Sequence, residues 1–429
     1  MFNSSRAGTH AAAKARRLVA TAAWLSILLI ASVPATAQDA VMEWNDIALK
    51  ATVTAGQGPV PQLRSMAIVQ VAVHDAVNAI TREYRTYLSI GGTPWNASPD
   101  AAAIAAAHHA LTRLFPDPDQ VRALNLARAT SLAARGLTER DPGVSFGEYV
   151  GGAIVSLRSN DGSAQAQFPY AAPGAGNPGV WVPVGPAPPA TPGWGSVTPW
   201  LLRRGSQFRP DGPPRLRGRR YARDYNEVQT LGASDSQTRT PQQTEIARFW
   251  LASPAAIWNG VARQVIQARH LDLSATARTF ALLYLATGDA SIACWDAKYT
   301  FNFWRPITAI RNGHADGNDD TSADPTWTPL FTTPQHPEYV SGHATNSSAM
   351  ATVLMRLFGD EPGTLIVAVS PTNPGFERRW ETFSDGVEEV IDARVYSGIH
   401  YRTSDEEGAR LGRRVARFVM NHALQPRKH

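Results

Sequence analysis

The sequence predicts an all-α fold of helical bundles. Apolar residues recur at helical spacing in almost every periodic stretch, and prolines or glycines mark the ends of these stretches. No run of alternating β-branched residues is long enough to indicate a sheet. Cys294 is the only cysteine, so no intrachain disulfide can form and a large hydrophobic core must stabilise the chain.

The expected helices fall into two groups. The N-terminal group comprises 62–80, opened by Pro61, then 100–114, stopped by Pro116, and then 119–134 and 146–157. The C-terminal group comprises 242–250, 255–269, 275–303, 343–358, 380–396 and 406–421.

Between the two groups the composition changes abruptly. Twelve prolines interrupt residues 169–214, while Trp181, Trp194 and Trp200 in the same stretch argue against disorder. We therefore interpret it as an ordered surface segment, a linker or lid, that joins two helical halves. The predicted organisation is a signal peptide at 1–37, an N-terminal helical region at 38–168, a Pro/Gly/Arg-rich connecting segment at 169–239 and a C-terminal helical domain at 240–429.

The first 37 residues have the pattern of an export signal. Four basic and no acidic residues precede or flank the apolar run 18–33, and Ala35-Thr36-Ala37 offers a cleavage site. We expect cleavage after Ala37 and a secreted or periplasmic product with no stable membrane anchor, the alternative being an uncleaved anchor. Cleavage would lower the formal net charge from +5 to about +1, which indicates no nucleic-acid partner. We interpret the arginine cluster at 203–223 as an exposed loop rather than a polyanion-binding patch.

Two cations precede a proline near the middle of the C-terminal half. Lys298 and Arg305 are seven residues apart, so on one helix both would point from the same face. Pro306 should end that helix and hold Arg305 extended. Two cations on one face favour an anion between them, although a pair of exposed surface cations explains the spacing equally well.

Two further motifs add groups that suit an oxyanion. Ser341-Gly342-His343 leads into a helix, whose free N–H groups and positive dipole end can bind an anion, although an ordinary serine cap would look the same. On a continuous helix, the side chains of Arg394 and His400 would point from different faces. Gly398 offers a helix end, after which His400 can return beside Arg394.

The three motifs follow one another as Lys298-x6-Arg305-Pro306, Ser341-Gly342-His343 and Arg394-x5-His400. This pattern resembles the superfamily of vanadium-dependent haloperoxidases and type 2 phosphatidic acid phosphatases. Residues 295–298, 301–311 and 73–78 also resemble its bacterial haloperoxidase-like branch, so the likeness covers most of the mature chain.

The resemblance implies a role for each matching residue. The oxyanion-binding residues would be Lys298, Arg305, Ser341, Gly342 and Arg394. The catalytic residues would be Lys298, which polarises peroxide, His343, the acid/base group, and His400, the axial vanadate ligand or, in a phosphatase, the phosphorylated nucleophile.

The resemblance therefore implies a vanadium-dependent haloperoxidase-like enzyme. Its cofactor would be vanadate and its substrates hydrogen peroxide and a halide. The alternative is a secreted acid phosphatase that hydrolyses phosphomonoesters through a phosphohistidine, without a metal, and a third possibility is an oxyanion-binding protein without turnover. The sequence does not separate these readings, nor does it give the halide, the ester or the oligomeric state.

The chain departs from the family pattern behind the ligand histidine. The aspartate that the family places four residues after it falls on Ser404, with Asp405 one residue later. Either Asp405 supports the site after a one-residue shift, or that support is missing. His336, seven residues before His343, is more typical of bromide-oxidising members. Whether the Pro-rich segment covers the site is left open.

Overall fold

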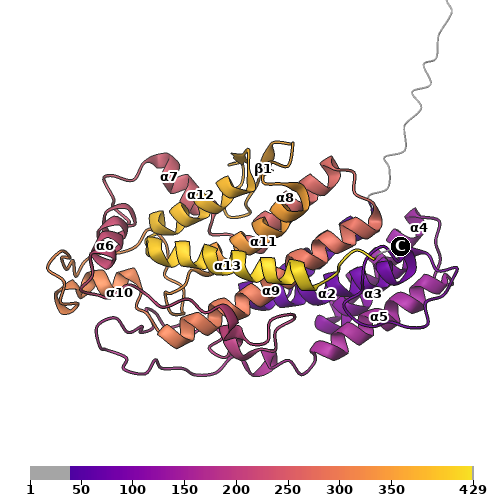
Figure 1. Cartoon of the computed structure of the whole chain (residues 1–429), viewed down its shortest axis with the longest axis horizontal. Helices are drawn as coiled ribbons and strands as arrows, with labels where there is room; N and C mark the ends of the chain where they lie inside the picture. Colours follow the sequence, from indigo (N-terminus) through magenta and orange to yellow (C-terminus); the bar gives the residue numbers. More distant parts are fainter. Residues whose placement is uncertain (1–38, 428–429) are drawn as a thin grey trace, which may run out of the picture. The chain divides into compact units, whose positions relative to one another are not determined.

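The computed structural model describes residues 39–427, and these confirm the all-α prediction (Figure 1). The only strands in this range are β1 (Ile366–Ala368) and β2 (Arg378–Trp380), a short antiparallel pair with Val367 opposite Arg379. The helices are α1 (Ala40–Thr54), α2 (Pro59–Thr81), α3 (Pro99–Leu114), α4 (Pro118–Ala134), α5 (Pro142–Arg158), α6 (Arg219–Leu231), α7 (Pro241–Phe249), α8 (Pro254–Ala268), α9 (Leu273–Phe301), α10 (Pro306–Arg311), α11 (Gly342–Phe358), α12 (Phe383–Tyr396) and α13 (Arg402–His422).

The predicted signal peptide at 1–37 lies outside the described residues. Within the described range, no helix combines the length and the apolar character needed to cross a bilayer. The described residues belong to one compact unit, so the division at residues 168 and 239 stays a prediction from composition.

Prolines and polar caps set where many of the helices begin. A proline occupies the first turn of α2, α3, α4, α5, α7 and α8, where its missing N–H would be unpaired in any case. Ser98, Asp117, Thr240 and Ser253 cap α3, α4, α7 and α8 through their side-chain oxygens. The predicted starts therefore fall one to a few residues late in these helices.

Helix α9 connects the two groups of helices. It packs against α2 on one side and against α11 and α13 on the other (Figure 1). The α2 helix in turn packs on α3 and α5, while α11 packs on α12 and α13. Helix α9 is buried along most of its length. Its C-terminal part lies against α11 inside the protein.

A pair of glycines lets α13 approach α11 closely. A Cβ atom added at Gly408 would lie 2.7 Å from the carbonyl oxygen of Ser341, and one added at Gly412 would overlap the carbonyl oxygen of Thr345. Both glycines lie one turn apart on the face of α13 that meets α11. The position of the first turn of α11 therefore depends on this close contact.

The Pro-rich segment is held onto the helices by its tryptophans. Trp181, Trp194 and Trp200 are buried. The backbone N–H of Trp181 donates to Asn302, and the N–H groups of residues 200–202 donate to the buried carboxylate of Asp289 on α9. The segment thus runs along α9 and lies near its C-terminal end.

Candidate active site

The first turn of α11 is the centre of the candidate site. Ser341 is the N-cap, and its hydroxyl oxygen accepts a hydrogen bond from the N–H of Ala344 at 3.5 Å. Gly342 and His343 follow as the first helical residues, and their N–H groups have no partner within the helix. The side chain of Ser341 is fully buried, whereas Gly342 and His343 are partly exposed.

The prediction that Lys298 and Arg305 share one helix face was wrong. Helix α9 ends at Phe301, because Asn302 adopts a left-handed conformation with φ of 47°. Arg305 is extended, with φ of −78° and ψ of 155°, as expected of a residue before proline, and it caps the short helix α10. The two cations nevertheless lie in one buried cluster, and both are 0% exposed.

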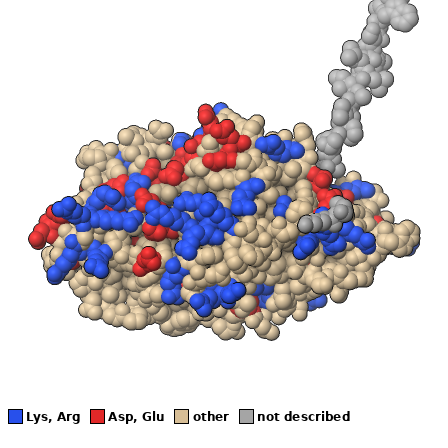
Figure 2. Space-filling view, in the orientation of Figure 1, with Lys and Arg blue, Asp and Glu red and all other residues tan. Residues whose placement is uncertain are grey.

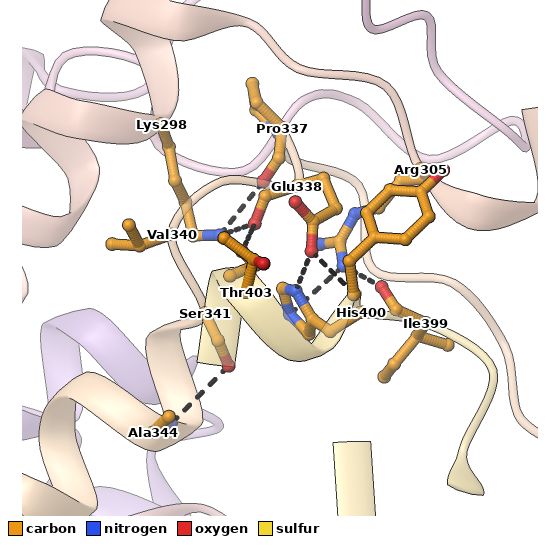
Figure 3. Close-up of polar contacts among 12 residues, drawn as sticks. Lys298, Arg305, Pro337, Glu338, Val340, Ser341, Ala344, Ile399, His400 and Thr403 are labelled. Carbon is orange, nitrogen blue, oxygen red and sulfur yellow. Dashed lines mark hydrogen bonds and ion pairs between the residues drawn. The ribbon is translucent and has the colours of Figure 1, made fainter. Parts of the chain in front are cut away.

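Lys298 contacts the loop that leads into α11. Its ammonium group donates to the carbonyl oxygens of Pro337 at 2.9 Å and Glu338 at 3.0 Å (Figure 3). It also lies 5.9 Å from the ring centroid of Trp295. Burial lowers the pKa of Lys298 to about 7, since a buried ammonium group loses the favourable hydration of its charge.

Arg305 joins the loop before α11 to the loop before α13. Its Nη1 donates to the carbonyl oxygen of Ile399 at 2.7 Å and lies 3.2 Å from Nε2 of His400 (Figure 3). Its Nη2 lies 2.9 Å from Nδ1 of His336. Burial lowers the pKa of Arg305 to about 10, and the nearby carboxylate of Glu338 opposes that shift.

Arg394 and His400 converge as the spacing predicts. Helix α12 ends at Tyr396, and Gly398, with φ of 76°, turns the chain back. Nη1 of Arg394 donates to the carbonyl oxygen of Trp250 at 2.8 Å, while its Nε has no hydrogen-bond partner among the described residues. Burial lowers the pKa of Arg394 to about 10.

The carboxylate behind His400 comes from Glu338, which the sequence reasoning missed. Oε1 of Glu338 lies 2.7 Å from Nδ1 of His400 and also accepts the N–H of Tyr401 at 3.1 Å (Figure 3). Both side chains are buried. This contact assigns the proton to Nδ1 and leaves the lone pair of His400 on Nε2. The sequence offered one indication of this role, since Glu338 is an acidic residue three positions before Ser341.

Asp405 does not take over that contact. It is fully buried, and neither of its carboxylate oxygens has a hydrogen-bond partner among the described residues with suitable geometry. Burial raises the pKa of Asp405 well above its ordinary value, and the nearby hydroxyl of Ser341 and the charge of Arg394 work against this rise. Ser404 instead uses its backbone oxygen to accept the N–H of Ser341 at 3.1 Å.

His343 is held by one ring nitrogen. Its Nε2 lies 3.2 Å from the carbonyl oxygen of Ala252, which can only accept, so Nε2 carries a proton and Nδ1 keeps its lone pair. Burial, together with the charge of Arg394, lowers the pKa of His343 well below its ordinary value. A neutral His343 with a free Nδ1 can accept a proton from a neighbouring molecule.

A pocket of about 390 Å³ opens onto part of this cluster. Four of the predicted site residues line it: Gly342, His343, Arg394 and His400. Lys298, Arg305 and Ser341 are not among its lining residues and lie buried beside it. His336 also lines the pocket, and its ring lies 5.2 Å from that of Trp295. Ala190 and Thr191 line it too, so the Pro-rich segment forms part of its wall, next to Gln167.

The described residues contain no cluster of three or more His, Cys, Asp or Glu side chains that could hold a metal cation. The candidate site is instead rich in cations, because it contains three buried basic side chains and only two buried carboxylates, those of Glu338 and Asp405. Such an arrangement suits an oxyanion.

The comparisons of this chain with known proteins agree with one another. Residues 278–429 match the family model of the VCPO second helical-bundle domain. The chain is 26% identical over 408 residues to the vanadium chloroperoxidase of Curvularia inaequalis, an alignment that covers 76% of this chain and 66% of that protein. The chain therefore spans less than two thirds of the length of this curated relative.

Two solved structures share the fold. A bacterial vanadium-dependent iodoperoxidase has a TM-score of 0.79 and 25% identity, over 91% of this chain and 98% of that one. The apo form of a bacterial vanadium-dependent chloroperoxidase has a TM-score of 0.67 and 21% identity, over 85% and 95% of the two chains. The matched bundle carries all seven residues of the predicted site, so the likeness to vanadium haloperoxidases includes the candidate site as well as the fold.

Proposed function

We propose that this protein is a vanadium-dependent haloperoxidase that oxidises a halide with hydrogen peroxide. The observation that carries the proposal is the group of three buried cations beside a helix N-terminus and two histidines, one of which is backed by a carboxylate. The names of the relatives, which are a chloroperoxidase and an iodoperoxidase, favour oxidation over ester hydrolysis.

The side chains fit vanadate as the resident group. Nε of Arg394 is buried and has no hydrogen-bond partner among the described residues, and burial lowers the pKa values of Lys298, Arg305 and Arg394 although Glu338 and Asp405 lie nearby, so a further anion would stabilise all three cations. Nε2 of His400 is the nitrogen left with a lone pair, so it is the atom that would bind vanadium. Bound vanadate would supply a Lewis acid that activates hydrogen peroxide towards the halide.

The protein's own groups would divide the remaining work. Lys298, Arg305 and Arg394 would neutralise the anion, with Ser341 and the N–H of Gly342 as hydrogen-bond donors. Glu338 would hold the His400 ring in one tautomer. His343, which is neutral and faces the pocket, would accept a proton from hydrogen peroxide and return it to the departing oxygen.

The proposal is tested by bromination of phenol red by the purified protein with hydrogen peroxide, before and after orthovanadate is added. Bromination that requires vanadate and is suppressed by phosphate supports a haloperoxidase. Phosphomonoester hydrolysis that vanadate inhibits, without bromination, would assign the protein to the phosphatases. Vanadate binding without either turnover would leave an oxyanion-binding protein.

We also propose that the protein is exported, on the basis of its basic N-terminus, apolar run and small-residue cleavage motif. Expression of the full chain in a bacterial host with N-terminal sequencing tests this. A mature product that begins at Gln38 supports export, and an intact Met1 in a cell-associated protein contradicts it.

A further inference from the structure

The pocket at the site is larger than the proposed small reactants require. Its volume is about 390 Å³, whereas hydrogen peroxide and a halide ion are species of one to four atoms. Pockets of about 300–1,000 Å³ typically hold organic ligands. The size therefore leaves room for a third reactant beside the anion-binding residues.

The walls of this pocket are mainly carbon. Residues 59–61, Pro-Val-Pro, contribute from the start of α2, and Pro254 contributes from the start of α8. Trp295 presents its indole from α9, and Pro334 lies in the loop before α11. Such a wall favours an uncharged, apolar occupant, because it offers no compensation for the lost hydration of a charge.

Three polar side chains in the wall, those of Gln167, Gln335 and Trp295, are already bonded within the protein. Gln167 accepts the N–H of Thr191 at 2.8 Å and donates to the carbonyl oxygen of Pro189 at 3.0 Å. Gln335 accepts the N–H of Val184 at 3.1 Å, and the indole N–H of Trp295 donates to Ala190 at 3.2 Å. These groups are therefore not free to solvate a ligand, which must be recognised by shape and apolar contact.

The part of the wall from the Pro-rich segment is firmly built. The carbonyl oxygen of Ala190 also accepts the hydroxyl of Tyr299 at 2.7 Å, and its N–H donates to Gln335 at 2.6 Å. Thr191 is held at φ of 45°, a conformation that β-branched residues rarely adopt. Strain of this kind persists where the surrounding contacts enforce it, as at ligand sites.

The remaining wall carries residues of the candidate anion site. Gly342, His343, Arg394 and His400 lie in the same lining as the apolar residues. Asn346, one turn beyond Gly342 on α11, also lines the pocket, and its Nδ2 forms no hydrogen bond with the described residues. It is a free donor for a single polar atom of an otherwise apolar ligand.

We propose that this pocket binds an uncharged, electron-rich aromatic compound and that halogenation takes place on the bound compound. The inference rests on the proposed haloperoxidase function. Hydrogen peroxide takes two electrons from the halide, and with one proton this gives hypohalous acid and water. The aromatic carbon then forms the carbon–halogen bond and loses its proton, while the oxygen of hypohalous acid leaves as water.

The test combines binding with two activities. The binding of 2-naphthol to the vanadate-free protein is measured by calorimetry. Its bromination is then compared with oxidation of iodide to triiodide, which needs no organic acceptor. Val60→Phe fills the pocket from α2, and Val369→Phe makes the same change at a side chain that is 60% exposed. We expect Val60→Phe to raise the KM for 2-naphthol about tenfold or more, with triiodide formation and the Val369→Phe protein nearly unchanged.

A second measurement does not depend on a variant folding. Naphthalene-2-carbonitrile has a similar shape but an electron-poor ring, so it should occupy the pocket without reacting. We expect it to compete with 2-naphthol bromination and to leave triiodide formation unaffected. Triiodide formation without saturable naphthol binding or competition would overturn the pocket inference alone. Absence of vanadate-dependent triiodide formation would instead count against the proposed function, whereas naphthol binding would still report on the pocket.

Discussion

The contact between Glu338 and His400 gives a quantitative prediction for vanadate affinity. Its two atoms lie 2.7 Å apart, both side chains are at most 2% exposed, and the same carboxylate oxygen accepts the N–H of Tyr401 at 3.1 Å. Removing the group that supports a metal-bound histidine typically lowers metal affinity about 10- to 100-fold. This corresponds to about 1.4–2.7 kcal/mol of binding free energy.

Two substitutions of Glu338 should lower vanadate affinity by amounts near the two ends of that range. Glu338→Gln removes the charge but retains an oxygen that can accept both N–H groups, so the loss of vanadate affinity should be near tenfold. Glu338→Ala leaves the ring N–H of His400 and the N–H of Tyr401 without an acceptor in a buried place, so the loss should approach about 100-fold.

Calorimetric titration of the apoprotein with orthovanadate measures these affinities. Asp289→Asn is the matched control, because Asp289 on α9 is a buried carboxylate like Glu338, but its hydrogen bonds among the described residues go to backbone N–H groups of the Pro-rich segment. It should bind vanadate as the natural protein does. A folded Glu338→Ala protein with unchanged vanadate affinity would refute the reasoning.

Three further predictions follow from the same structure. His400→Ala should abolish vanadate binding in calorimetry. His343→Ala should bind vanadate within a few-fold of normal but lose bromination. Full bromination by the His400→Ala protein would contradict the assignment of the site. Gly412→Ala should lower the free energy of unfolding in urea by about 2 kcal/mol or more because its Cβ overlaps the backbone of α11. Gly260→Ala should be neutral or slightly stabilising, because among the described residues an added Cβ meets no atom within 4 Å outside its own stretch of helix. Burial raises the pKa of Asp289 to about 6, so the folded state binds its proton more tightly than the unfolded chain does. The free energy of unfolding of the natural protein, relative to that of Asp289→Asn, should therefore fall as the pH rises from about 4 to about 6 and then level off. Urea titrations at each pH measure this difference, and a rise over that interval would show that the pKa is shifted in the opposite direction.

Helical periodicity was sufficient to predict most of the long helices, but α1 and α6 were missed. The buried face of α6 includes Tyr221, Ala222, Tyr225 and Val228 within a run of arginines, and such a run is typical of an exposed basic loop. Several of those arginines are indeed exposed, and Figure 2 shows Lys and Arg side chains gathered on the face that presents α13. The absence of a nucleic-acid partner stays a prediction.

The motifs located the candidate site, but not the way its parts meet. Spacing alone placed Lys298 and Arg305 on one helix, because nothing in the sequence marks Asn302 as a left-handed residue that ends α9. Glu338 could not be assigned to His400, since 62 residues separate them and only the packed loops bring them together. The pocket wall from α2 was equally beyond prediction, because it depends on how α2 packs against α9.

The lining of the pocket also has a consequence for how such proteins diverge. All seven residues of the predicted anion site lie between 298 and 400, whereas part of the pocket wall comes from residues 58–61 and from Gln167, Ala190 and Thr191. Mutations in those two stretches can alter which molecule enters without touching any group that holds the anion. Selection can therefore act on reactivity and on substrate choice separately, and a descendant of this gene could acquire a new substrate while the reaction stays the same.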